Sequence, residues 1–270
     1  MPELPEVETT KRGLEPLLVG QTIANLEIRD PRLRWPVEAA LPARVKSQCV
    51  RSLERRGKYL IVYLDDGAML IHLGMSGRLR YVTDATPPEL HDHFDVSLSS
   101  GSKLRFNDPR RFGSLHFAEF PESHWLLKNL GPEPLGEEFT ASYLFGISRG
   151  RRVAIKQFIM NGNIVVGVGN IYASEALYRA GIRPTRPAGR IARHRYGLLV
   201  DAVKTVLEEA IQAGGTTLRD FLDSDGRAGY FQQELSVYGR TGEPCNRCGE
   251  PIRQKTIGQR ATFLCVACQR

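Results

Sequence analysis

The sequence predicts an α+β protein of several domains, because three kinds of pattern follow one another along its 270 residues. Short apolar strands with Gly and Asp turns dominate the first half, helical periodicity dominates most of the second, and a cysteine-rich hairpin comes last. This length suits two domains, and an apolar fraction of 41% is enough for their cores.

The first predicted element is a helix near the N-terminus. Pro5 suits the first helical turn, Val7, Leu14 and Leu18 have helical spacing, and Pro16 leaves the end of the helix uncertain. Strands are then predicted at 59–64, 68–73, 78–82, 94–98, 103–106 and 114–120. Short strands separated by Gly and Asp turns are typical of a β-sandwich or a β-barrel.

The second half of the chain has a helical pattern of apolar residues instead of short strands. Residues 121–150 contain the segment Gly131-Pro132-Glu133-Pro134 and are interpreted as a connector. Helices are predicted beyond it at 153–160, 170–180 and 193–213.

Four of the five cysteines form a metal-binding pattern. Cys245 and Cys248 make one C-x2-C knuckle, sixteen residues follow, and Cys265 and Cys268 make the other. This spacing is typical of a zinc ribbon, in which four thiolates close a tetrahedral structural site; two disulfides are the alternative. Predicted strands at 251–256 and 261–264 place Arg260 near the tip of the hairpin, where the ribbon could enter a nucleic-acid groove or serve only as a fold staple.

Composition narrows the class of partner. No apolar run of about 18 residues occurs, and the first ten residues carry two prolines and three glutamates, which excludes a membrane protein and a secreted precursor. Lys and Arg number 37 against 30 Asp and Glu, a net charge of +7. The basic residues gather in separate groups at 51–58, 105–111, 149–156 and 240–270, which suits a nucleic-acid backbone.

The segment from Gly167 to Asn170 leads into a predicted helix, where backbone N–H groups can hold a phosphate. It is not a dinucleotide fingerprint, because Tyr172 replaces the third glycine. Together with Lys156 on the preceding helix, it could form a helix–turn–helix that binds DNA phosphates, or it could be a structural turn.

Any catalysis must come from ordinary side chains or from the N-terminus, since no Ser-His-Asp, H-E-x-x-H or P-loop pattern is present. Removal of the initiator methionine would give Pro2 a secondary amine that is partly neutral at pH 7. Such an amine can attack a sugar C1′ and form an iminium ion, with Glu3 and Glu6 beside it for proton transfer. An N-terminal proline without a catalytic role is the alternative.

Six segments together resemble the formamidopyrimidine-DNA glycosylase family over nearly the whole chain. They are MPELPEVET at 1–9, IHLGMSGRL at 71–79, NDPRRFG at 107–113, VVGVGNIYASEALYRAGI at 165–182, GGTTLRDF at 214–221 and the paired C-x2-C motifs. The chain is most similar to the bacterial, zinc-containing branch; the related endonuclease VIII enzymes share the Pro-Glu start but differ in the residues after it.

The resemblance implies three domains: an N-terminal β-sandwich with a leading helix (1–131), a helical helix–two-turn–helix domain (132–239) and a four-cysteine β-hairpin zinc finger (240–270). One structural zinc ion is expected, with no organic cofactor. The partner is double-stranded DNA containing oxidised bases, and the protein is expected to be a monomer. Its location would be the bacterial cytoplasm, in association with the nucleoid.

By the same resemblance the protein is a base excision repair enzyme, a bifunctional DNA glycosylase and AP lyase that removes 8-oxoguanine and formamidopyrimidines. Pro2 would be the Schiff-base nucleophile and Glu3 would handle protons. Lys58 would donate a proton in β-elimination, and Arg260 would act in δ-elimination. An endonuclease VIII-type enzyme for oxidised pyrimidines and a non-catalytic zinc-ribbon DNA-binding protein remain as alternatives.

The resemblance also implies contacts to DNA. Met75, Arg110 and Phe112 match a trio that fills the gap left by an extruded base, with Arg110 reading the orphaned cytosine. The remaining expected backbone contacts are His72, His91, Arg151, Lys156 and Asn170. Residues 214–229 correspond to a loop that covers the extruded base.

Overall fold

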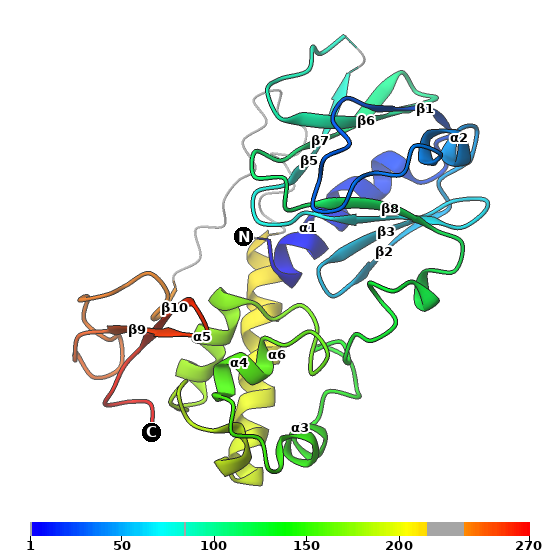
Figure 1. Ribbon diagram of the computed structural model, residues 1–270. Coiled ribbons are helices and arrows are strands. Elements are labelled where there is room, and N and C mark those ends of the chain that lie inside the picture. Colours follow the sequence, from blue (N-terminus) through cyan, green and yellow to red (C-terminus); the bar gives the residue numbers. More distant parts are fainter. Residues whose placement is uncertain (1, 84, 215–234) are drawn as a thin grey trace. The chain divides into compact units, whose positions relative to one another are not determined.

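The computed structural model describes residues 2–83, 85–214 and 235–270 (Figure 1). The chain divides into two compact units, one of residues 1–128 with 211–231 and the other of residues 129–210 with 232–270. The expected covering loop at 214–229 lies outside the described residues except for Gly214. The described helices do not include one with the length and apolar character that a membrane crossing requires.

The first unit contains the predicted β-sandwich. One antiparallel sheet has the strand order β1-β6-β7-β5, and the other has the order β2-β3-β4-β8. The strands are β1 (Ile23–Ile28), β2 (Ser52–Arg56), β3 (Tyr59–Tyr63), β4 (Ala68–His72), β5 (Arg78–Thr83), β6 (Asp92–Leu98), β7 (Ser102–Asn107) and β8 (Ser114–Ala118). Alternate residues of both sheets, such as Leu60, Ile71, Phe94 and Phe106, point inward and form one apolar core. The sandwich is therefore confirmed over the barrel.

Helix α1 (Leu4–Leu18) confirms the leading helix. Val7, Leu14 and Leu18 belong to the core of the sandwich, as their spacing predicts. Pro16 lies within the helix, which ends two residues later. A five-residue helix, α2 (Leu41–Val45), and a short 3-10 turn, η1 (Pro121–Ser123), complete the regular elements of this part of the chain.

The second unit is helical, but its first helix begins earlier than the sequence pattern predicts. Helix α3 (Ala141–Ser148) lies in the segment interpreted as a connector, and that interpretation was wrong for these residues. The Thr140 side chain accepts a hydrogen bond from the Tyr143 N–H at 3.1 Å, an N-cap that starts the helix. The other elements are α4 (Ile155–Ile159), α5 (Asn170–Arg179), η2 (Ala188–Arg190) and α6 (Arg193–Gly214), of which residues 211–214 are counted with the first unit.

The last regular element is the predicted hairpin of β9 (Arg253–Ile257) and β10 (Arg260–Leu264), which packs against α5 (Figure 1). Gly258 and Gln259 form a two-residue turn with φ values of +55° and +61°. Positive φ at both positions matches the twist of an antiparallel pair, so the turn fixes the register that places Arg260 opposite Ile257.

Candidate functional site

The first part of the site is the N-terminal end of α1, where Glu3 is the N-cap residue. Glu3 is fully buried, and its N–H donates to the Glu6 carboxylate at 2.7 Å in a capping box. Pro2 lies directly before this cap and is half-buried. The cap therefore fixes the backbone at Glu3, the expected proton carrier, directly after Pro2, the expected nucleophile.

Lys58 lies in the two-residue turn between β2 and β3, next to Gly57. Gly57 has a φ of +59°, which a hairpin turn of this kind assigns to glycine. Arg55 connects this turn to α1: its Nε donates to the Glu8 carboxylate at 2.9 Å and its Nη1 donates to the Gly57 carbonyl at 3.2 Å. The element that carries Pro2 and the turn that carries Lys58 are thus joined by one guanidinium.

His72, at the end of β4, is held as a neutral imidazole. Burial, helped by the positive charges of Lys58 and Arg34, lowers the pKa of His72 to about 4. Its Nδ1 accepts a hydrogen bond from the Gly74 N–H at 2.9 Å. The proton of the neutral ring is therefore on Nε2, which is available as a donor.

Two loops of the first unit carry Met75 and the pair Arg110 and Phe112. The loops are in backbone contact, because a Cβ added at Gly74, whose φ is +66°, would lie 2.4 Å from the Phe112 carbonyl carbon. Met75 is 37% exposed and Phe112 is 42% exposed, so neither belongs to the core. The Arg110 guanidinium lies over the Phe112 ring, 5.1 Å from its centroid.

Sequence reasoning did not identify Asp108, which holds these two loops together. Its carboxylate is fully buried and accepts hydrogen bonds from Ser76 Oγ at 2.6 Å, Gly113 N at 2.8 Å and Arg110 N at 3.3 Å. Asp108 stands between Asn107 and Pro109 in the segment NDPRRFG, but the donors that it serves come from both loops, so spacing alone does not reveal its role.

His91 precedes β6 in the left-handed backbone region, with a φ of +72°. Its carbonyl accepts from the Asp108 N–H at 3.0 Å. The loop before it is fixed by the buried Arg105, whose guanidinium donates to the Thr86 and Pro87 carbonyls at 3.0 and 2.8 Å. Arg105 also forms a salt bridge of 2.8 Å with Asp95.

That salt bridge keeps the Asp95 carboxylate charged inside the protein. Burial alone would raise its pKa, but hydrogen bonds from Arg105 and Arg29 outweigh this effect and lower the pKa of Asp95. The basic residues at 105–111 therefore do not share one role: Arg105 is buried in an ion pair, whereas Arg110 is exposed.

The second unit places two expected DNA contacts against the hairpin. Lys156 is 1% exposed, and its Nζ donates to Thr262 Oγ1 at 2.9 Å and to the Ala261 carbonyl at 3.1 Å. Asn170, the first residue of α5, donates through Nδ2 to the same carbonyl at 3.1 Å. Both side chains therefore hold the backbone of Ala261, directly after Arg260. Arg260 and Arg151 are themselves exposed.

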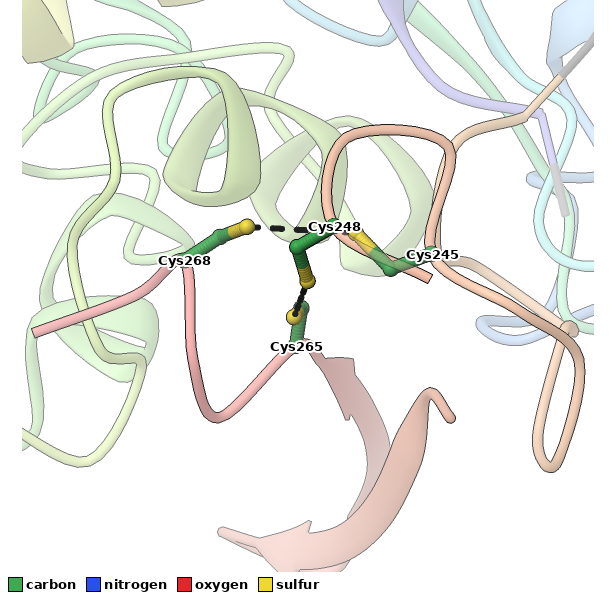
Figure 2. A group of neighbouring side chains, drawn as sticks. All are labelled: Cys245, Cys248, Cys265 and Cys268. Carbon is green, nitrogen blue, oxygen red and sulfur yellow. Dashed lines mark hydrogen bonds between the residues drawn. The ribbon is translucent and has the colours of Figure 1, made fainter. Parts of the chain in front are cut away.

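The four cysteines converge as predicted (Figure 2). Their Sγ atoms all lie within 4.8 Å of one another, with 3.9 Å between Cys245 and Cys268 and 3.4 Å between Cys248 and Cys265. A tetrahedral zinc ion bound at about 2.3 Å requires sulfur–sulfur distances of about 3.8 Å. Both distances are far longer than a disulfide bond, so the donor set fits one structural zinc ion and the disulfide alternative was wrong.

Three family models match the chain in order. They are the formamidopyrimidine-DNA glycosylase N-terminal domain at residues 1–115, the formamidopyrimidine-DNA glycosylase H2TH domain at 130–222 and a zinc finger found in FPG and IleRS at 242–270. Among curated relatives, the formamidopyrimidine-DNA glycosylases of Syntrophotalea carbinolica and Stutzerimonas stutzeri are 58% and 54% identical, and each alignment covers all of both chains.

Solved structures are similar over the same length. Lactococcus lactis formamidopyrimidine-DNA glycosylase bound non-covalently to DNA with an AP site has a TM-score of 0.88 and 33% identity, and the match covers 99% of each chain. The same enzyme with Fapy-dG-containing DNA has a TM-score of 0.90 and 34% identity, covering 99% of this chain and 100% of that one.

Proposed function

Since this chain belongs to the formamidopyrimidine-DNA glycosylase family, we propose that it removes oxidised purines, 8-oxoguanine and formamidopyrimidines, from duplex DNA and then nicks the damaged strand. The observation that carries the proposal is the match of three family models in order along a single chain. The basic net charge and the buried cap at Glu3 support it.

Base removal begins at Pro2. Once Met1 has been removed, the Pro2 nitrogen lone pair attacks C1′, the bond from C1′ to the base breaks, and the base leaves with the proton that the nitrogen gives up. The C1′–O4′ bond then breaks, O4′ takes up a proton, and the opened sugar is held as an iminium ion, with Glu3 as the group that moves protons at the base or the sugar. A fully buried carboxylate held by a helix cap suits this role, because the cap keeps it in one position relative to the reacting atoms.

Strand nicking follows from the iminium, which draws electrons from C2′. Loss of a C2′ proton expels the 3′ phosphate by β-elimination, and a second elimination expels the 5′ phosphate. We assign Lys58 to proton donation in the first step and Arg260 to the second, where a cation stabilises the departing phosphate. Lys58 lies on one hairpin turn and Arg260 directly follows another, and neither is buried.

A base inside the stack is out of reach, so we infer that the damaged nucleotide is extruded and that Met75 and Phe112 fill the gap. Their exposure supports this role, since apolar wedges must be presented outside the core. Arg110, whose guanidinium lies over the Phe112 ring, would read the orphaned cytosine with its hydrogen-bond donors.

Four of the five further residues expected at the DNA backbone are assigned to it. His72 would donate from Nε2, and exposed Arg151 would hold a phosphate by charge; the same class of contact is assigned to His91 and Asn170. For Lys156 the geometry favours a supporting role, since it is almost fully buried and bonded to Ala261 and Thr262.

The three-domain division at 1–131, 132–239 and 240–270 agrees with this assignment of tasks, and we keep it as a proposal. The first domain would carry the nucleophile, the wedge and the backbone contacts of His72 and His91, and the other two would supply the remaining backbone contacts and Arg260. Binding to DNA in this way would associate the protein with the nucleoid.

Borohydride reduction tests the proposal. With a duplex containing 8-oxoguanine, the protein should form a covalent adduct, and peptide mass mapping should place it on Pro2. A duplex containing thymine glycol serves as the comparison and should react more slowly. Faster reaction with thymine glycol would favour the endonuclease VIII-type alternative. No adduct on either duplex, with protein whose initiator methionine has been removed, would leave only a DNA-binding protein.

A further inference from the structure

A side chain outside the zinc finger is hydrogen-bonded to one of the four zinc ligands. Tyr178, on α5, places its phenolic oxygen 3.1 Å from Cys245 Sγ. Tyr178 and Cys245 are each only 3% exposed, so water does not compete for this hydrogen bond. At neutral pH a phenol is protonated and a zinc-bound cysteine is a thiolate, so the hydroxyl is the donor.

The same thiolate has a second donor. The Arg247 N–H, within the first knuckle, points at Cys245 Sγ from 3.4 Å. The Arg247 guanidinium lies over the Tyr178 ring at 4.6 Å, and it also donates to the Tyr178 and Arg179 carbonyls at 3.3 Å each. A cation on the face of the ring withdraws electron density from it, which makes the phenol a stronger hydrogen-bond donor.

Helix α5 thus holds the hairpin at two places. Asn170 at its start donates to the Ala261 carbonyl, and Tyr178, about two turns later, donates to Cys245. Tyr178 also belongs to the small apolar core that the hairpin and the helix share, together with Ile252 and Phe263.

We propose that Tyr178 is a positioning residue of the zinc site, whose hydroxyl bond to Cys245 stabilises the thiolate and slows loss of the metal. A hydrogen bond to a metal-bound thiolate lowers the basicity of the sulfur, so protons and oxidants attack it less readily. Outer partners of metal ligands typically change metal affinity by about 10- to 100-fold when they are removed. The proposal concerns the ion itself and does not depend on the reaction with DNA.

The test uses the zinc-loaded full chain and the variant Tyr178→Phe, which removes one oxygen and keeps the ring. Zinc release to a chromogenic chelator, after addition of hydrogen peroxide, is the first readout. The matched control is Tyr196→Phe, which removes another buried phenol of the same unit, whose hydroxyl donates to the Ala188 carbonyl at 3.0 Å. We expect Tyr178→Phe to release zinc at least about fivefold faster than both the wild type and the control.

Cobalt(II) substitution provides a readout that a general loss of stability would not move. The ligand-field bands of a tetrahedral four-thiolate site show whether the site assembles in the variant. In Tyr178→Phe the thiolate-to-cobalt charge-transfer band should move to longer wavelength, because a sulfur that has lost a hydrogen bond gives up electrons more easily. The control should leave the band in place. Zinc release less than fivefold faster, equal acceleration in both variants, or an unmoved band would each overturn the proposal.

Discussion

Asp108 offers the sharpest test of how the two loops that carry Met75 and Arg110 are held. In Asp108→Asn, one acceptor oxygen becomes an NH2 group of nearly the same size. The remaining oxygen can serve the Gly113 N–H, but Ser76 Oγ and the Arg110 N–H then face a donor. The substitution therefore removes a charged acceptor from a buried site without leaving a cavity.

The expected cost follows from the number of bonds changed. A hydrogen bond to a charged group contributes about 1.5–3 kcal/mol, and Ser76 can rotate its hydroxyl to accept from the new amide. We therefore expect the free energy of unfolding to fall by about 2–3 kcal/mol. The loosened loop should also weaken discrimination of the base opposite the lesion by about 1 kcal/mol, roughly a fivefold change in relative cleavage rate.

Urea denaturation measures the first effect, and cleavage of 8-oxoguanine duplexes carrying each of the four opposite bases measures the second. Asp66→Asn is the control, since this exposed aspartate in the β3–β4 turn makes the same chemical change away from both loops. If Asp108→Asn matched the control in both assays, the carboxylate would not organise the loops. If stability fell with discrimination unchanged, the link from Asp108 to Arg110 would be refuted.

Three other predictions address the rest of the site. Cys248→Ser should release zinc and abolish tight DNA binding, whereas Cys49→Ser, outside the cluster, should do neither in a chelator assay and a binding titration. Arg55→Gln should slow strand nicking more than borohydride trapping, because the Lys58 turn loses its connection to Glu8. Arg12→Gln removes another Glu8 partner and should leave the ratio of nicking rate to trapping rate unchanged. In the folded protein the pKa of His72 is lowered to about 4, so unfolding takes up a proton between about pH 6.5 and 4. The free energy of unfolding of the wild type should therefore fall as the pH falls across this range. Urea titrations should show a smaller fall in His72→Gln.

The features that the sequence predicted well are those set by neighbours in the chain. Each cysteine knuckle is local, and the Gly258-Gln259 turn fixes how the strands between the knuckles pair, so spacing alone led to the zinc site. The leading helix was predictable in the same way, because one apolar stripe of α1 faces the core. Helix α3 was missed since its short apolar run follows a segment rich in Gly and Pro, and its N-cap at Thr140 is a weak signal alone.

Residues whose roles depend on distant partners were harder to predict. Lys156 belongs to a basic group, and charge suggested a phosphate partner; only the fold shows that its ammonium is used by Thr262, more than a hundred positions away. Arg105 alternates along β7 in a way that suits a solvent-facing side chain, yet it is buried against Asp95. In both cases a cation that composition alone assigns to the ligand is used to hold a loop or a hairpin.

This difference bears on how the basic character of the chain should be interpreted. The net charge of +7 does not equal the number of cations that can bind DNA phosphates. Buried Arg105 is neutralised by Asp95, and the ammonium of buried Lys156 donates to a backbone carbonyl and a hydroxyl oxygen. The salt dependence of DNA binding reports only the phosphates neutralised at the surface. Arg151→Gln should therefore reduce the slope of log affinity against log salt by about one, whereas Lys156→Met should weaken binding and leave that slope nearly unchanged. Equal changes of slope in the two variants would show that Lys156 reaches a phosphate after all.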